Sequence, residues 1–131
     1  MAVQGTSLEE LPAELMRLID ALDVESCGAL LPGDAQGIDE ISRGWMRGRE
    51  SIEAYLEQIK DTVAGLSSSV SDVHAVDWGD TGVVTFVLDQ SYDYAGRHVE
   101  ITAPTSLVCR REDAAWKVAV FHSAPLPEAG A

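Results

Sequence analysis

The stretch "WKVAVFHSAP" from Trp116 to Pro125 decides the fold, because it is an apolar run of strand length that closes on a proline. β-Branched and aromatic side chains favour a strand over residues 116–123, and Pro125 cannot donate to a continuing ladder. Strict alternation predicts one face with Trp116, Val118, Val120 and His122 and another with Lys117, Ala119, Phe121 and Ser123. Both faces are mostly apolar, so we expect both sides of the sheet to be covered.

Three further strands are predicted upstream, over residues 70–78, 83–94 and 98–111. The connections between consecutive strands are short and rich in turn residues, with the sequences "GDTG", "AGR" and "EDA". Such connections join antiparallel neighbours, so the four strands are expected to form a meander. Pro104 has no backbone donor, and we expect a bulge or bend at that position.

Helices are predicted in the first half of the chain. Leucines separated by three and four residues over 8–22 indicate a helix with Pro12 in its first turn. Asp23 is placed to cap a second, short helix. An apolar stripe over residues 49–65 predicts the third helix, with Gly65 as its C-terminal cap.

The order of these elements indicates an α+β fold, with helices first and strands after them. Residues 37–48 carry several glycines and are interpreted as an ordered loop. The length of 131 residues suits a single domain over residues 1–131, with a core over about 8–126.

Composition and charge exclude several classes of function. The net charge of −13 would repel nucleic acid and anionic membrane surfaces. The two cysteines, Cys27 and Cys109, lack the spacing of a zinc site, and no signal peptide or dinucleotide-binding, P-loop or nucleophile-elbow motif is found. We therefore expect a cytoplasmic protein with reduced thiols and without a metal or cofactor.

Together these features resemble the NTF2-like superfamily with its cystatin-like cone, and within it the SnoaL-like and ketosteroid-isomerase-like branch. The resemblance rests on "GIDEISRGWMRGRESIEAYLEQ" (37–58) and on the final "W-K-V-x-V-F-H-S-x-P", and covers about residues 8–126. The ending is also similar to the association domain of calcium/calmodulin-dependent kinase II. The resemblance implies a helix-lidded cone with an internal pocket, usually dimeric, in a fold that hosts isomerases, dehydratases, cyclases and non-catalytic binding modules.

The resemblance also implies which residues line the pocket. Association domains carry pocket arginines where this chain has Leu88, Leu107 and Ser123, so an apolar pocket is expected here. The same alignment places Ala119, Phe121 and Ser123 inside the cone and turns His122 toward a partner subunit. We expect a homodimer packed sheet to sheet with twofold symmetry, because a second copy would cover the outer face.

Candidate catalytic residues are few. A proton-transfer enzyme of this fold needs an acid or histidine in the cavity, and Asp89 and His122 are the nearest candidates. Against this, His122 fits a packed interface histidine, and Asp89 a solvated or interface acid. Asp39 and Glu40 lie in the loop that could overhang the mouth of the cone. The three histidines of the chain, His74, His98 and His122, fall on different strands and do not suggest a metal site.

The preferred hypothesis is a dimeric protein that binds a small hydrophobic molecule. The expected ligand-binding residues are Trp45, Tyr55, Phe86, Leu88, Gln90, Leu107, Phe121 and Ser123. Gln90 and Ser123 would orient the ligand by hydrogen bonds. Two alternatives stay open: a cofactor-independent isomerase, cyclase or dehydratase acting on a polycyclic or polyketide-like ketone, and a non-catalytic assembly module.

Overall fold

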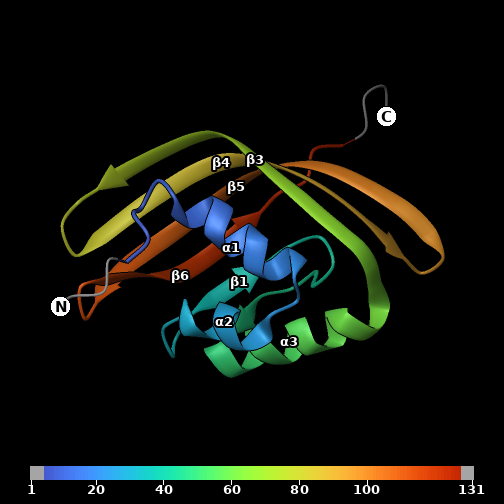
Figure 1. The fold of residues 1–131 in the computed structure, drawn as a ribbon, viewed down its shortest axis with the longest axis horizontal. Coiled ribbons are helices and arrows are strands. Elements are labelled where there is room, and N and C mark those ends of the chain that lie inside the picture. The colour runs from blue at the N-terminus through green and yellow to red at the C-terminus, as the bar shows by residue number, and fades with distance from the viewer. Residues whose placement is uncertain (1–4, 128–131) are drawn as a thin grey trace.

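Three helices and a six-stranded sheet make up the α+β fold that the computed structural model describes for residues 5–127. The helices are α1 (Leu11–Asp20), α2 (Val24–Ala29) and α3 (Arg49–Thr62). The strands are β1 (Gln36–Ile38), β2 (Met46–Arg47), β3 (Val63–Asp77), β4 (Thr81–Tyr94), β5 (Arg97–Glu112) and β6 (Ala115–Ser123), in the order β2-β1-β6-β5-β4-β3. The sheet curves over the helices, which all lie on its concave side (Figure 1). None of these helices is both long and apolar enough to cross a membrane.

The predicted meander is confirmed, because β3 to β6 pair in sequence as antiparallel neighbours. Two of the connections are two-residue turns with positive φ at both central residues, Ala95–Gly96 and Asp113–Ala114. These left-handed pairs give the twist that matches the twist of the flanking strands. Pro104 does not interrupt the sheet, since the register between β4 and β5 is continuous through the pair Val87–Pro104.

The expected bulge at Pro104 is therefore wrong, and the reason lies in the neighbouring strand. The Pro104 carbonyl accepts from the Ala124 amide, just beyond the end of β6. The amide nitrogen and carbonyl of one strand residue point to the same side, so the nitrogen that lacks a proton also faces the position where β6 has ended. No ladder donor is lost there.

The long edge strand β3 begins directly after α3, at Val63, and not at residue 70. The register between β3 and β4 shifts by one residue at two places. Gly65, with φ +65°, lies at the first shift, and Asp72, with φ +53°, lies at the second. Gly65 therefore serves a β-bulge, and its predicted role as a helix cap is wrong. The two bulges bend β3, which climbs away from the end of α3 in Figure 1.

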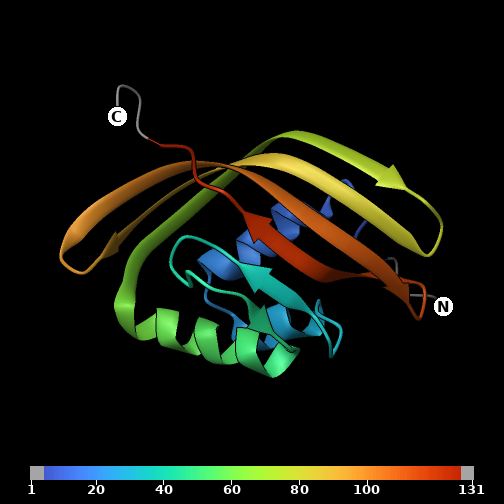
Figure 2. The ribbon, with the colours of Figure 1, turned by 180° about the vertical axis from the view of Figure 1, so that it is seen from behind.

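The segment interpreted as a loop over residues 37–48 holds part of β1 and all of β2. β1 pairs parallel with β6, with Gly37 opposite Phe121 and Ile38 opposite His122, and antiparallel with β2. Figure 2, which shows the molecule from behind, has β1 beside β6 on the side facing the viewer. This pairing carries the chain after Ile38 to the concave side of the sheet, where the cavity lies.

Helix α1 packs its apolar stripe against the concave face. Ser7 and Glu10 exchange the two hydrogen bonds of a capping box across the preceding turn, and Pro12 lies in the first turn as predicted. Asp23 caps α2 by accepting from the Ser26 amide. The main core joins the α1 side chains to the inner face of the sheet, with Leu11, Leu15, Met16, Val84, Phe86, Leu88, Leu107, Cys109, Trp116 and Val118 among its members.

Strand β6 contains a bulge that changes its two faces. Val108 pairs with Val120 but Cys109 pairs with Val118, so Ala119 is an extra residue without a partner. Alternation restarts after it, and Trp116, Val118 and Ser123 are buried on the inner face while His122 is exposed. The strict alternation expected for β6 is therefore wrong: Trp116 and Val118 lie on the same side as Phe121 and Ser123.

Candidate functional site

A cavity of about 80 Å³ lies between the helices and the concave face of the sheet. Most of its lining is apolar and comes from α1, α3, β4 and β6, with Leu15, Met16, Ile19, Ile52, Leu56, Ile59, Leu88, Val118 and Phe121. Its polar lining includes Asp39, Glu40, Tyr55, Gln90 and Ser123. The cavity is thus an apolar space with a few directed polar groups, which is the usual composition of a small-molecule site.

Asp39 holds the turn that follows β1. Its Oδ1 accepts from the backbone amides of Ile41 (3.0 Å) and Ser42 (2.8 Å), as in an Asx turn. The Tyr55 hydroxyl of α3 also donates to this carboxylate, 2.9 Å from Oδ1 and 2.8 Å from Oδ2. With these donors, Asp39 fixes the loop to α3 and has little capacity left for a ligand.

Glu40 is the more available of the two acids. Its Oε2 accepts from the Tyr92 hydroxyl of β4 at 2.8 Å, and no hydrogen bond is found to Oε1 within residues 5–127. Burial is the main reason that the pKa of the Glu40 carboxyl is raised above its usual value, and the neighbouring Asp39 charge adds to this. A half-buried carboxyl group with one open oxygen can accept a hydrogen bond or a proton from a molecule in the cavity.

Gln90 reaches the cavity from β4, and its amide orientation follows from a short network. The Ser68 hydroxyl donates to Asp20 Oδ1 at 2.6 Å and accepts from Gln90 Nε2 at 3.1 Å. A hydroxyl has one proton, so its partner at Gln90 must be the amide NH₂. The Gln90 carbonyl oxygen is therefore the acceptor left to face other molecules.

The two cysteines are inert in this setting. Cys27 lines the cavity and Cys109 lies in the core, and burial raises the pKa of their thiols to about 11 and about 12. Both thiols are protonated at neutral pH, which makes them poor nucleophiles. In the described part of the chain, no three His, Cys, Asp or Glu side chains are grouped to hold a metal ion.

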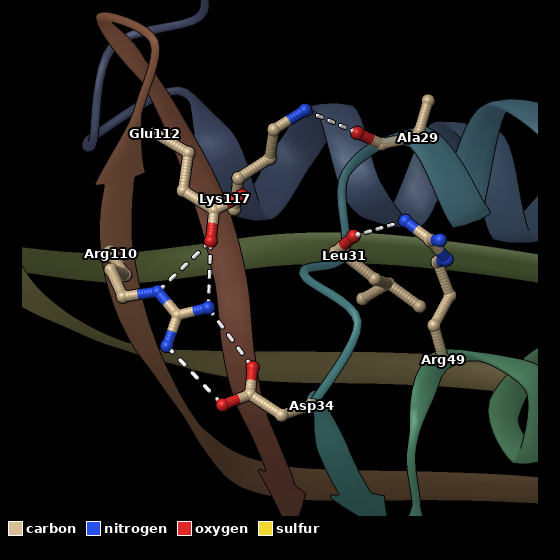
Figure 3. Close-up of polar contacts among 7 residues, drawn as sticks. All are labelled: Ala29, Leu31, Asp34, Arg49, Arg110, Glu112 and Lys117. Carbon is tan, nitrogen blue, oxygen red and sulfur yellow. Dashed lines mark hydrogen bonds and ion pairs between the residues drawn. The ribbon is translucent and has the colours of Figure 1, made fainter.

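Basic side chains near the site are used for anchoring. Figure 3 shows Arg110 bound to Asp34 and Glu112, Lys117 bound to the Ala29 carbonyl, and Arg49 bound to the Leu31 carbonyl. These contacts fix the connection between α2 and β1 to the sheet and to α3. No Lys, Arg or His of residues 5–127 lines the cavity, so nothing there offsets the acidic pair.

The structure brings together five of the side chains predicted to bind a ligand. Tyr55, Leu88, Gln90, Phe121 and Ser123 all line the cavity. Ser123 is buried, and its Oγ lies 3.3 Å from the Thr105 hydroxyl.

The other predicted ligand-binding residues lie elsewhere. Phe86 and Leu107 are buried in the main core behind the cavity wall and do not line it. Trp45 is 44% exposed and stacks on His122, with ring centroids 5.9 Å apart, outside the cavity. The prediction failed for Trp45 because β2 turns the preceding segment to the outer side of β1 and β6.

Neither predicted catalytic residue faces the cavity. Asp89 is exposed on the outer face, where it accepts from the Thr102 hydroxyl at 2.6 Å. His122 is exposed and points away from Ser123, as the resemblance implied. Because proton transfer needs contact with a bound molecule, this placement removes both as catalytic groups of the cavity.

The acid that does reach the cavity was considered in the sequence only as an overhanging loop residue. The available signal was an acidic pair directly after the short run Gln36–Ile38. Three residues are too few to show alternation, so the strand that directs Asp39 and Glu40 inward could not be identified. Its partner Tyr92 lies on a strand that could be predicted, but 52 residues away in sequence.

Comparison with solved structures shows the fold. A protein from Xanthomonas campestris, provisionally described as a calcium/calmodulin-dependent protein kinase II association domain, superposes with a TM-score of 0.79 at 17% identity, covering 98% of this chain and 99% of that chain. A ketosteroid isomerase-like protein from Erwinia carotovora atroseptica gives 0.77 at 12% identity, covering 94% and 97%. An NTF2-like protein with a cystatin-like fold from Novosphingobium aromaticivorans gives 0.75 at 19% identity, covering 93% and 81%.

The family follows from the sequence comparison. No curated protein matches the chain significantly. The family model of the SnoaL-like domain matches residues 8–127, which is nearly the whole chain. The chain therefore belongs to the SnoaL-like domain family.

Proposed function

We propose that this SnoaL-like domain binds a compact, mostly apolar and uncharged molecule, with a hydrogen-bond donor of the ligand directed at Glu40. The observation that carries the proposal is an apolar cavity whose acidic residue has one open carboxyl oxygen. Two adjacent acids without a basic neighbour in the cavity disfavour a carboxylate or phosphate ligand, because a buried anion would have no countercharge.

The size of the cavity limits the ligand. Sites for drug-sized molecules usually enclose about 300–1,000 Å³, whereas this cavity measures about 80 Å³. A single ring with a short polar substituent is therefore a better match than the polycyclic ketone considered from the sequence. The flexible side chains of Met16 and Met46 line the cavity and allow small adjustments of its shape.

Three ligands of one shape test the proposal: toluene, benzyl alcohol and benzoate, with binding followed by NMR chemical shifts at pH 7. Benzyl alcohol should bind most tightly, since it can donate to Glu40, and benzoate should not bind. Glu40→Gln should weaken the binding of benzyl alcohol by roughly tenfold, as expected for loss of a hydrogen bond to a charged group. Glu50→Gln, an exposed acid of α3, is the matched control. Equal binding of benzoate and benzyl alcohol would contradict the proposal.

A second candidate function is proton transfer at carbon, with Glu40 as the base. It is favoured by the raised pKa of Glu40 in apolar surroundings, which suits a general base near neutral pH. For 3-cyclohexen-1-one, Glu40 would remove a proton beside the carbonyl and return it at the far alkene carbon, giving the conjugated isomer. The test is the growth of enone absorbance, which Glu40→Gln should abolish. If benzyl alcohol binds but the enone does not form, proton transfer is rejected and ligand binding is the function that is supported.

We also propose that two copies pair through the outer face of the sheet. Val83, Val108 and Val120 lie side by side across β4, β5 and β6 on this face, and all three remain partly exposed in the isolated chain. A partner sheet would cover them. In the third possible function, a non-catalytic assembly module, this face would be the functional surface. A cytoplasmic location remains the expectation that goes with these proposals.

A further inference from the structure

The contact between Glu40 and Tyr92 joins two parts of the chain with very different surroundings. Glu40 lies in the connection between β1 and β2, whereas Tyr92 lies in β4, which is paired on both sides by β3 and β5. The Tyr92 side chain is 3% exposed and packs with Ile59 and Val63 in a buried cluster. The tyrosine is therefore the fixed partner, and the position of the loop carboxyl follows from it.

The direction of this hydrogen bond is set by proton chemistry. An ionised carboxylate can only accept, and a phenol has one proton to donate. Burial and the neighbouring acids raise the pKa of Tyr92, so its hydroxyl keeps that proton across the neutral range. Tyr92 consequently donates to Oε2 of Glu40 at 2.8 Å, and this oxygen is occupied whenever Glu40 is ionised.

We propose that Tyr92 is a positioning residue, which holds Glu40 by Oε2 and so reserves Oε1 as the oxygen that meets a molecule in the cavity. The proposal rests on the proposed function in one respect, namely that Glu40 is the group facing the ligand. It adds that a residue of the sheet, and not the loop itself, determines which oxygen does so.

The same contact controls the charge of Glu40. The groups that act on this carboxyl are the backbone amide of Glu40 itself, Tyr92 from β4, Asp39 beside it and, through Asp39, Tyr55 from α3. Burial and Asp39 favour the protonated form of Glu40, and its own backbone amide and the Tyr92 hydroxyl favour the ionised form. Removing the hydroxyl should therefore make Glu40 bind its proton more tightly.

The chain offers a matched control for this test. Tyr55 donates to Asp39 over the same distance, 2.8 Å, and also lines the cavity. Tyr55→Phe removes a hydroxyl that donates to Asp39 in the same acidic site, and it leaves the hydrogen bond from Tyr92 to Glu40 in place. A difference between Tyr92→Phe and Tyr55→Phe at Glu40 is thus specific to the direct contact.

The experiment is an NMR titration of the Glu40 side-chain carboxyl in the full chain without ligand. Tyr92→Phe should increase the proton affinity of Glu40 by roughly tenfold, the equivalent of one hydrogen bond to a charged group. Tyr55→Phe should change it by much less. An unchanged or lowered proton affinity of Glu40 in Tyr92→Phe would overturn the proposal.

Two further measurements keep the result interpretable. If Tyr92→Phe does not fold, 3-fluorotyrosine at position 92 retains the ring and donates more strongly, so Glu40 should bind its proton less tightly; the opposite shift would overturn the proposal. Benzyl alcohol binding to Glu40→Gln tests the proposed function separately. A shifted titration with unchanged ligand binding by Glu40→Gln would support the positioning role and reject Glu40 as the ligand-binding group.

Discussion

At the scale of single residues, Glu40 shows how a functional group can cost stability. Its carboxyl has a raised pKa in the folded protein, because burial and Asp39 disfavour the charged form. The folded state therefore binds the Glu40 proton more tightly than the unfolded state. By linkage, the favourable contribution is complete below the ordinary value of 4.5 and is lost as the pH rises through the folded-state pKa.

Glu40→Gln should consequently stabilise the protein at neutral pH but not in acid. The gain should be present at pH 7 and should shrink toward pH 4, where the protonated carboxyl carries no charge. Urea unfolding at several pH values measures this difference. A gain that is constant with pH would mean that Glu40 does not titrate as its surroundings imply.

At the scale of elements, the β5–β6 hairpin carries a local strain that the sequence does not relieve. Asp113 and Ala114 both have positive φ, 52° and 66°, in the two-residue turn. This region costs an L-residue roughly 1–2 kcal/mol, and glycine occupies it freely. Ala114 is exposed, so its methyl group contributes no packing in return.

Ala114→Gly should therefore stabilise the protein by about 0.5 kcal/mol, after allowance for the greater freedom of glycine in the unfolded chain. Ala115→Gly, one residue later and inside β6, should instead destabilise it by about 0.5–1 kcal/mol. The free energy of unfolding of both variants, from denaturant titration, decides the matter. Two effects of the same sign would show that the turn geometry is not the cause.

The elements also show where sequence patterns were informative. β3 to β6 could be predicted because each is long and bounded by a short turn. β1 and β2, with three and two residues, are too short to show a period, although β1 directs Glu40 to the cavity. Gly65 was predicted to end a helix because a left-handed glycine suits both a helix end and a bulge. Only the pairing of β3 with β4 distinguishes the two.

At the scale of the whole molecule, the net charge of −13 bears on self-association. Copies of the chain repel one another in general, so a dimer has to form through a surface of low charge. The row Val83–Val108–Val120 provides such a surface on the outer face.

Val108→Lys should break the proposed dimer, because a lysine at the centre of this row would be buried without a partner charge. We expect an association at least roughly 100-fold weaker. Sedimentation velocity at micromolar concentration measures it. Ala54→Lys, at an exposed position of α3, introduces the same charge elsewhere and should leave the dimer intact. A wild-type monomer at this concentration would contradict the proposed pairing.

The whole-molecule fold and the apolar character of the cavity could be predicted from the sequence, but the contact that places Glu40 in its lining could not. Tyr55 belongs to a helix stripe, which is a local pattern, and the family resemblance implied that Leu88, with Gln90 two residues later on the strand, lines the pocket. The hydrogen bond between Glu40 and Tyr92 joins a loop to a strand 52 residues later in the sequence. A local sequence pattern cannot predict a contact between residues so far apart.

Side chains along a strand alternate between its two faces, and in β6 one extra residue, Ala119, shifts this alternation. Ala119 has no partner across the ladder, yet it decides that Phe121 and Ser123 face the cavity while Val120 and His122 face outward. Deletion of Ala119 would remove the bulge and keep these four side chains on their present faces, whereas a strand that paired every residue, Ala119 included, would exchange the two pairs. The lining of the cavity thus depends on which residue of β6 is left out of the pairing, and not only on the composition of the strand.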